Sequence, residues 1–403
     1  MDPIRVDVPR LRAGLIVLLA LLAASLTPAH AQGQAWRIGV VLSASAGSAL
    51  GAQQTQLARY SATVLAASGV FGEPIDLLLR DDAGDPRRAE AAALELIDAG
   101  AVALVCCTSV SATHRVSQVA EARGVPLLAL DGEAAAGDVW TLAVRADTRT
   151  RLTAIAVDAS DAGRFSLALM TPDNAFGAAV ATAFEGALSD TSRAAVAEVR
   201  YDPAAPVLTP EAMLAATRQP GAIVVWGGGA DTARAIEALR HRGWFGAAYV
   251  RAEAFTPAHW SRVEVGGLAA ALGAPASSSD PWGAVSSVLA PVSVAEALPA
   301  EHPNRAAALA ALERIEASVG PVAALQRAEL ALLDDALLLL QRAFEQVAAL
   351  GLPGPLDDGR VRQAVLDALR SAPAQPLGAG TYHARSTDAR LARWQGLVPV
   401  SLR

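Results

Sequence analysis

The chain has 403 residues, and its hydrophobic fraction of 53% is enough to fill the cores of two domains of ordinary size. Its formal net charge of −7 disfavours nucleic acid and anionic membrane surfaces as partners, because both are negatively charged. Two cysteines do not make a disulfide framework, so the hydrophobic cores must supply the stability.

Residues 1–31 have the layout of a cleavable secretory signal. Three arginines precede the apolar run AGLIVLLALLAASL, and the small residues Ala29 and Ala31 mark a cleavage site. The apolar run is short for a membrane span, which disfavours the alternative of an uncleaved anchor. We therefore predict a periplasmic protein whose mature chain starts near Gln32. The leader removes three arginines and two aspartates, so the formal charge of the mature chain becomes −8.

Strand-like apolar runs then alternate with stretches of helical length. Uninterrupted apolar strands separated by helices are typical of a parallel sheet that is covered on both faces. The strand-like runs are WRIGVVLSA, EPIDLLLRDD, AVALVCC and VPLLALDG, and the predicted helices span 53–68, 86–99 and 112–123. This part of the chain is predicted to form a doubly wound α/β lobe.

A second set of the same kind follows the segment WTLAVRADTRTR. It consists of RFSLALMTPD, a helix over 175–188, AIVVWGGGADTARAIEALRHRGW and GAAYVRAEAF, and it predicts a second α/β lobe. The stretch GAPASSSDPWG marks a boundary because it is rich in Ser and Pro. Three helices are predicted beyond it, over 304–318, 322–350 and 359–371, and LARWQGLVPVSLR is predicted to add a final strand.

In an open parallel sheet a ligand lies beyond the carboxyl ends of the strands, so the loops there are the candidate site. The loop CCTSVSATHR is rich in hydroxyl groups and joins a strand to a helix. Its residues Ser109 and Ser111 are predicted to contact a ligand anion, and the alternative is that they only cap the helix. The acidic turn DDAGDP is predicted to cap the helix that follows it.

Signals for catalysis and cofactors are missing from the sequence. We find no GxSxG, HExxH or SxxK motif, and no metal-ligand spacing of His and Cys. The GGGAD loop lacks the GK[ST] ending of a phosphate loop, which disfavours a nucleotide. We therefore expect a protein that is not an enzyme and has no cofactor.

Cys106 and Cys107 are adjacent at the end of an apolar strand. A disulfide between neighbours would strain the backbone, so we predict two small buried thiols, with a redox switch as the alternative.

The combination of a signal peptide, two α/β lobes and the segment LLLRDDAGDPRRAEAAALELIDAGAVALV resembles the periplasmic substrate-binding proteins of branched-chain amino acid ABC importers. The resemblance extends over nearly all of the mature chain and includes TPDNAFGAAVATAFEGAL and LLDDALLLL. It implies the type I periplasmic binding fold, with lobe 1 at 36–145 and 275–385 and lobe 2 at 146–274 and 386–403. Hinge crossings are expected at 145–150, at 269–275 and around Tyr382.

The resemblance also implies a set of ligand-binding residues. Relatives that bind amino acids hold the ligand carboxylate with a hydroxyl loop and the ammonium group with an acid and aromatic residues of the other lobe. The predicted equivalents here are Leu50, Ser109, Val110, Ser111, Phe176, Trp226 and Glu253. Phe176 replaces a tyrosine of the family, and Leu50 replaces an aromatic residue.

One loop departs from the family pattern. Asp131 and Glu133 follow VPLLAL, where relatives carry small and hydroxyl residues. Two acids that face the cleft would repel a ligand carboxylate and favour a cationic or neutral ligand, whereas acids that face solvent would leave the amino acid interpretation intact.

These observations predict an exported, monomeric solute-binding protein. It would close its lobes on a small polar ligand, such as an amino acid or a related amine or amide, and deliver it to the permease subunits of an ABC importer. The alternative is a ligand-sensing or scaffold protein that keeps the fold without transport, and nothing in the sequence separates the two.

Overall fold

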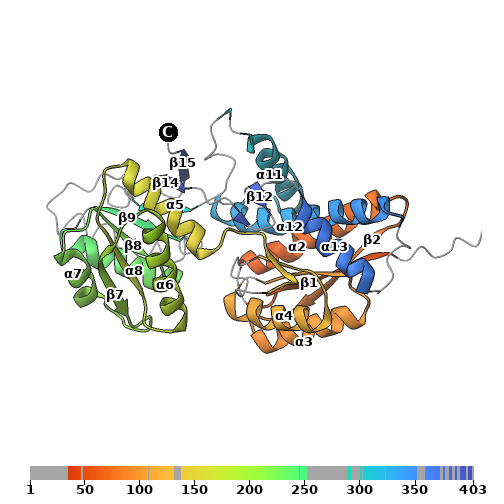
Figure 1. The fold of residues 1–403 in the computed structure, drawn as a ribbon, viewed down its shortest axis with the longest axis horizontal. Coiled ribbons are helices and arrows are strands. Elements are labelled where there is room, and N and C mark those ends of the chain that lie inside the picture. The colour runs from red at the N-terminus through yellow and green to blue at the C-terminus, as the bar shows by residue number, and fades with distance from the viewer. Residues whose placement is uncertain are drawn as a thin grey trace, which may run out of the picture.

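The computed structural model describes residues 35–372, apart from 47–48, 108, 131–137, 245, 252–287, 292–299, 302, 323 and 352–358, together with short strands between 375 and 401. The predicted signal lies outside the described residues. The chain forms two α/β lobes that lie side by side along the longest axis of the molecule (Figure 1). In the described part of the chain, no helix combines the length and apolar character that a membrane span requires.

Lobe 1 is built on a parallel sheet with the strand order β2-β1-β3-β4-β5. All residues of β3 and β4 are buried, as expected of strands that have helices on both faces. The strands are β1 (Trp36–Leu42), β2 (Ile75–Asp81), β3 (Ala103–Cys106), β4 (Leu127–Ala129) and β5 (Thr141–Ala143).

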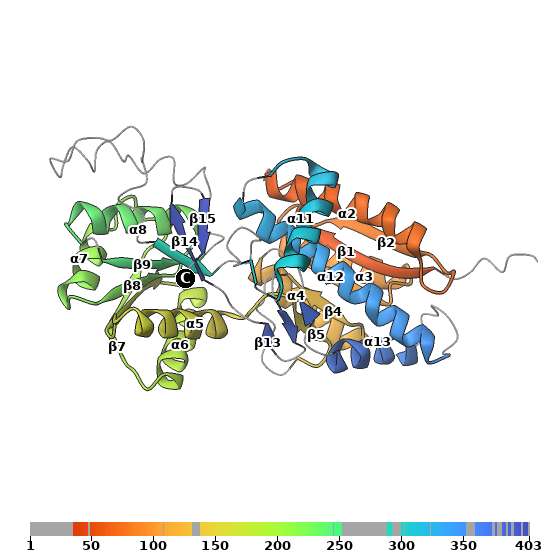
Figure 2. The same cartoon turned by 90° about the horizontal axis from the view of Figure 1, so that it is seen from above.

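Two hydrophobic clusters cover the faces of this sheet. The first joins it to helices from opposite ends of the chain, and Trp36 of β1 stacks on Phe344 with ring centroids 4.6 Å apart. This cluster involves α2 (Ala49–Ser68), α11 (Arg305–Val319), α12 (Ala324–Ala349) and α13 (Gly359–Ser371), and the second involves α3 (Pro86–Asp98) and α4 (Val110–Arg123). Figure 2 shows α11, α12 and α13 on the same lobe as β1 and β2, so the C-terminal helices complete lobe 1.

Lobe 2 has a mixed sheet with the order β15-β14-β10-β9-β8-β6-β7. Four of its strands form the parallel part: β6 (Leu167–Pro172), β7 (Ala195–Tyr201), β8 (Ala222–Val225) and β9 (Ala247–Val250). Helices α5 (Thr148–Asp161) and α6 (Ala175–Asp190) pack on one face, and α7 (Thr209–Thr217) and α8 (Gly229–His241) pack on the other. Both lobes therefore have the predicted doubly wound α/β organisation.

The C-terminal strands divide differently from the prediction. Strand β10 (Val288–Pro291) pairs with β9 in parallel and with β14 (Leu391–Gln395) antiparallel, so it belongs to the sheet of lobe 2. The predicted boundary, which gave 275–385 to lobe 1, was wrong for this strand, because backbone pairing with a distant strand leaves no local signal. β15 (Val398–Ser401) adds to β14, and a separate small sheet contains β11 (Gln375–Pro376), β12 (Thr381–His383) and β13 (Ser386–Thr387).

The first crossing between the lobes runs from the end of β5 at Ala143 to the start of α5 at Thr148, and it overlaps the predicted segment 145–150. Arg145 forms a partly buried ion pair with Glu329 of α12, which fastens the crossing to lobe 1. Asp147 then accepts a hydrogen bond of 2.7 Å from the Thr150 backbone NH and caps α5 at its N-terminus. The predicted crossing at 269–275 lies outside the described residues.

The acidic turn after β2 has the predicted capping role. Asp85 is the N-cap of α3 and accepts a hydrogen bond of 2.8 Å from the Arg87 backbone NH, and Pro86 occupies the first helical position. Asp82, which is 1% exposed, accepts a 2.8 Å bond from the Gly84 NH and closes the turn. The neighbouring Asp81 accepts hydrogen bonds from Ser45, and these lower the pKa of Asp81.

Candidate functional site

A cleft of about 900 Å³ lies between the two lobes, next to the carboxyl ends of their parallel strands. Lobe 1 contributes the start of α4, and lobe 2 contributes residues at the starts of α5, α6 and α8 and after β9. The described lining consists of Ser109, Val110, Ser111, His114, Asp147, Thr148, Arg149, Pro172, Asn174, Ala175, Phe176, Ala179, Val180, Ala183, Pro203, Gly228, Asp231 and Arg251. The wall is therefore apolar along α6 and polar at the helix N-termini.

The lobe 1 wall is the hydroxyl loop after β3. Ser109 is the N-cap of α4, where its hydroxyl oxygen accepts a 3.3 Å hydrogen bond from the Ala112 NH. Its carbonyl oxygen accepts the Thr113 hydroxyl at 3.0 Å. Ser109 thus caps the helix and also lines the cleft, and its hydroxyl proton remains available as a donor because the cap uses only the oxygen. Ser111 lies in the first turn and is exposed to the cleft.

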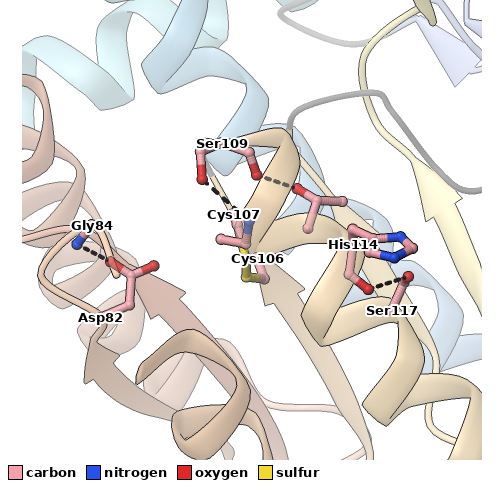
Figure 3. The surroundings of a disulfide bond; sticks show 9 residues. Asp82, Gly84, Cys106, Cys107, Ser109, His114 and Ser117 are labelled. Carbon is pink, nitrogen blue, oxygen red and sulfur yellow. Dashed lines mark hydrogen bonds between the residues drawn. A yellow bond between two sulfur atoms is a disulfide. The ribbon is translucent and has the colours of Figure 1, made fainter. Parts of the chain in front are cut away.

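Behind this loop, Cys106 and Cys107 form a disulfide across a cis peptide bond (Figure 3). Both residues are fully buried, in the core that β3 shares with α3 and α4. The prediction of two thiols was wrong, although the predicted burial is confirmed. The prediction rested on the argument that a disulfide between neighbours would strain the backbone, whereas here the two sulfur atoms lie together.

The start of α6 forms the apolar part of the lobe 2 wall. Asn174 is the N-cap and accepts a 3.0 Å hydrogen bond from the Gly177 NH. A Cβ on Gly177 would lie 1.8 Å from the Pro172 carbonyl oxygen, so only glycine allows the helix to start this close to β6. The glycine therefore fixes the position of its neighbour Phe176, whose ring lines the cleft.

A buried polar pair supports the start of α8. The Tyr201 hydroxyl, at the end of β7, donates a 2.8 Å hydrogen bond to Asp231, whose carboxylate lines the cleft although the residue is only 6% exposed. Burial, and then the charge of Asp231, raise the pKa of Tyr201, so its hydroxyl stays protonated and donates. A Cβ on Gly227 would lie 2.0 Å from the Tyr201 hydroxyl, which explains the first glycine of the GGGAD loop by packing.

Arg251 is the first residue after β9 and extends the lobe 2 wall. Its guanidinium carbon lies over the Phe176 ring, 5.2 Å from the ring centroid, which is a cation–π geometry. The positive charge of Arg251 opposes the rise in the pKa of Tyr201 that burial and the charge of Asp231 cause. Arg251 comes from the loop after β9 and Phe176 from α6, so their contact joins the charged and aromatic parts of the wall.

The other charged groups of the lining have structural partners. Asp147 caps α5, as described above. Arg149 makes bidentate contacts to Asp190 of α6, at 2.8 and 3.2 Å, and both side chains are about half exposed. His114 of α4 lies 3.1 Å from the Gln118 amide through its Nε2 atom.

The residues predicted from the resemblance fall into three groups. Ser109, Val110, Ser111 and Phe176 line the cleft together. Trp226 is fully buried in the core of lobe 2, with the Arg151 guanidinium 5.0 Å from its ring centroid, and Leu50 packs against the core of lobe 1. Neither is part of the described lining, so we leave both out of the site. Asp131, Glu133 and Glu253 lie outside the described residues.

Asp231 and Arg251 were missed by the sequence prediction. Arg251 lies in the loop after β9, and Asp231 lies in the first turn of α8, just beyond the loop that follows β8. The site residues predicted in these two segments were Glu253 and Trp226. The signal that could have identified Arg251 was its position, because it directly follows the carboxyl end of the apolar strand AAYV, where ligands of parallel sheets lie. Within the described chain, no group of three His, Cys, Asp or Glu side chains is arranged to hold a metal ion.

A family model described as periplasmic binding protein matches residues 35–395. The chain belongs to the periplasmic binding protein family. Members of this family bind solutes and are not enzymes, and the family places the protein in the periplasm or outside the cell. The predicted family and the type I periplasmic binding fold are therefore confirmed.

Solved structures show the same fold at low sequence identity. An extracellular ligand-binding receptor from Rhodopseudomonas palustris HaA2 is 18% identical, with a TM-score of 0.72, and the match covers 92% of this chain and 100% of that one. The leucine binding protein LivK from Thermotoga maritima is 18% identical over 90% and 97% of the two chains, with a TM-score of 0.68. LivJ from Streptococcus pneumoniae, solved in complex with isoleucine, is 14% identical. That match covers 91% of this chain and 98% of LivJ, with a TM-score of 0.68. A search of curated proteins gives no match.

Proposed function

We propose that this periplasmic binding protein captures a small polar ligand, an amino acid or a related amine or amide, between its lobes and delivers it to an ABC importer. The observation that supports the proposal most directly is the cleft between the lobes, which has a hydroxyl loop on one wall and an aromatic residue and charges on the other. The similarity to LivK and LivJ supports the same class of ligand.

The proposed binding step is closure of the lobes around the crossing segments. Closure would bring the hydroxyl loop of lobe 1 and the α6 wall of lobe 2 onto opposite sides of the ligand. Excluding water from the cleft would strengthen each polar contact, because electrostatic interactions weaken with increasing dielectric constant. The ion pair between Arg145 and Glu329 would keep the start of the first crossing attached to lobe 1 during this motion.

Lobe 1 is proposed to hold a ligand carboxylate through Ser109 and Ser111, which lie at the N-terminus of α4. Glu253 is proposed to hold an ammonium group, on the resemblance alone. Glu253→Gln should then keep the fold and weaken an amine-bearing ligand by about 2 to 5 kcal/mol, the usual cost of breaking a buried charge pair. Asp131→Ala tests whether the acidic loop selects for positive charge. Unchanged affinity in Glu253→Gln would remove this residue from the site.

A thermal-shift screen of the mature protein against amino acids, amides, amines and short carboxylates tests the proposed function. A ligand at a hundred times its dissociation constant stabilises the folded protein by about 2.7 kcal/mol, which is readily measured. Ser109→Ala with Ser111→Ala should reduce the shift, whereas Ser189→Ala, a serine outside the described lining, should not. If no compound of these classes stabilised the protein, the proposed function would fail.

Delivery to an importer requires a second measurement. Cells that lack this protein should lose uptake of the labelled ligand found in the screen, and expression of the full-length chain should restore it. Normal uptake in those cells would separate ligand binding from transport and would favour a sensing or scaffold role.

A further inference from the structure

The lobe 2 wall carries a feature that the resemblance does not predict, namely the Arg251 guanidinium over the ring of Phe176. The guanidinium lies 5.2 Å from the ring centroid, and both residues line the cleft. Stacking on a ring holds the plane of a guanidinium while its edges keep their N–H donors, of which arginine has five. An arginine held in this way can keep contacts within the protein and still donate two parallel hydrogen bonds to a carboxylate.

The two carboxylates of the described lining accept hydrogen bonds within the protein. Asp231 accepts the Tyr201 hydroxyl at 2.8 Å and lies in the first turn of α8, where the helix dipole favours negative charge. Asp147 accepts the Thr150 NH. The second arginine of the lining, Arg149, is paired with Asp190 at the outer end of α6. The lining thus combines a guanidinium that lies over an aromatic ring with acids that accept hydrogen bonds from the protein.

We propose that Arg251 binds an anionic group of the ligand, with Phe176 orienting the guanidinium, and that the transported solute therefore carries a carboxylate or a similar anion against lobe 2. This inference rests on the proposed function and narrows the ligand class. It differs from the pattern implied by the resemblance, in which lobe 2 holds only the ammonium side of an amino acid. Solutes with an acid group at this end, such as acidic amino acids or dicarboxylates, fit better than neutral aliphatic ones.

The experiment compares acids with their matched amides by titration calorimetry on the mature protein. Suitable pairs are glutamate and glutamine, succinate and succinamide, and leucine and leucinamide. Wild-type protein should prefer the acid of at least one pair. Arg251→Gln should weaken binding of that acid by about 30-fold or more, because the anion loses its charged partner in a closed site. The amide should change by less than about threefold.

Two variants separate ligand recognition from structural effects. Arg200→Gln removes an arginine of lobe 2 that lies outside the described lining and is paired with Glu198, and it should leave affinity nearly unchanged. Phe176→Leu should weaken acid binding less than Arg251→Gln, because it removes only the support of the guanidinium. A purely structural role, in which Arg251 offsets the charge of Asp231, gives a different result. Arg251→Gln would then lower stability, and the double variant with Asp231→Asn would restore it. In that case the preference for acids would persist in both variants.

The outcomes also distinguish this inference from the proposed function. If a neutral or cationic solute bound equally well to wild type and to Arg251→Gln, the inference would be overturned while solute binding remained. If acids bound wild type and lost no affinity in Arg251→Gln, the anion would lie elsewhere and the inference would again fail. Absence of binding by every compound would contradict the proposed function and this inference with it.

Discussion

Replacing Gly227 by alanine tests whether the glycine loop exists to make room for the Tyr201–Asp231 pair. The new Cβ would lie 2.0 Å from the Tyr201 hydroxyl and 2.7 Å from the nearer Asp231 oxygen. Ordinary contacts begin at 3.4 Å, so the hydroxyl would have to move by about 1.4 Å. A hydrogen bond of 2.8 Å does not survive such a displacement.

The expected cost follows from two contributions. Loss of a buried hydrogen bond to a charged acceptor costs about 1.5 to 3 kcal/mol, and overpacking a close-packed site costs about 1 to 3 kcal/mol. We therefore expect Gly227→Ala to lower the free energy of unfolding by about 2.5 to 6 kcal/mol. Tyr201→Phe removes the hydroxyl alone and should cost about 1.5 to 3 kcal/mol.

The two changes should not be additive, because both act on the same hydroxyl group. The double variant should be more stable than the sum of the single effects predicts, by about 1 to 3 kcal/mol, when measured by urea unfolding of the mature protein. Gly359→Ala, at the start of α13, is the control, since a Cβ there would meet no atom within 4 Å. It should show no coupling to Tyr201→Phe. Strict additivity for Gly227→Ala would refute this explanation of the loop.

Three further predictions concern other parts of the chain. The exported protein should begin at Gln32, and N-terminal sequencing that found the leader intact on a membrane-bound protein would contradict this. Changing Cys106 and Cys107 together to alanine should lower stability yet leave ligand affinity nearly unaltered, because both are fully buried in the core; a loss of affinity well beyond the loss of stability would instead give them a role in the site. Arg314→Met should cost about 3 to 5 kcal/mol at neutral pH, because Asp334, which is 4% exposed, would lose the partner that lies 2.6 Å away. Burial raises the pKa of Asp334, so this loss should shrink as the pH falls and the carboxylate is protonated, and a pH-independent loss would argue against it.

The sequence determined the features that depend on neighbouring residues. The alternation of apolar runs and amphipathic stretches predicted two α/β lobes, since a strand that is covered on both faces must be apolar throughout. Helix ends were also predictable where the signal is local: Asp85 precedes Pro86 at the start of α3, and its carboxylate satisfies an NH two residues later. The hydroxyl loop could be marked as a candidate site because its position after a strand is written in the order of elements.

Tertiary structure decided the features that join distant residues. Trp226 is an aromatic residue in a candidate loop by sequence, yet it is fully buried against Arg151, some 75 positions earlier in the chain. Strand β10 joins lobe 2 because its backbone pairs with β9 and β14. Neither the composition of the strand nor its hydrophobic periodicity identifies these partners. The contact of Arg251 with Phe176 likewise brings together the residue after β9 and a residue of the first turn of α6, which are 75 positions apart in the chain. Local propensities and hydrophobic period fix which elements form, whereas packing across the sheet determines which side chains reach the cleft and which are buried.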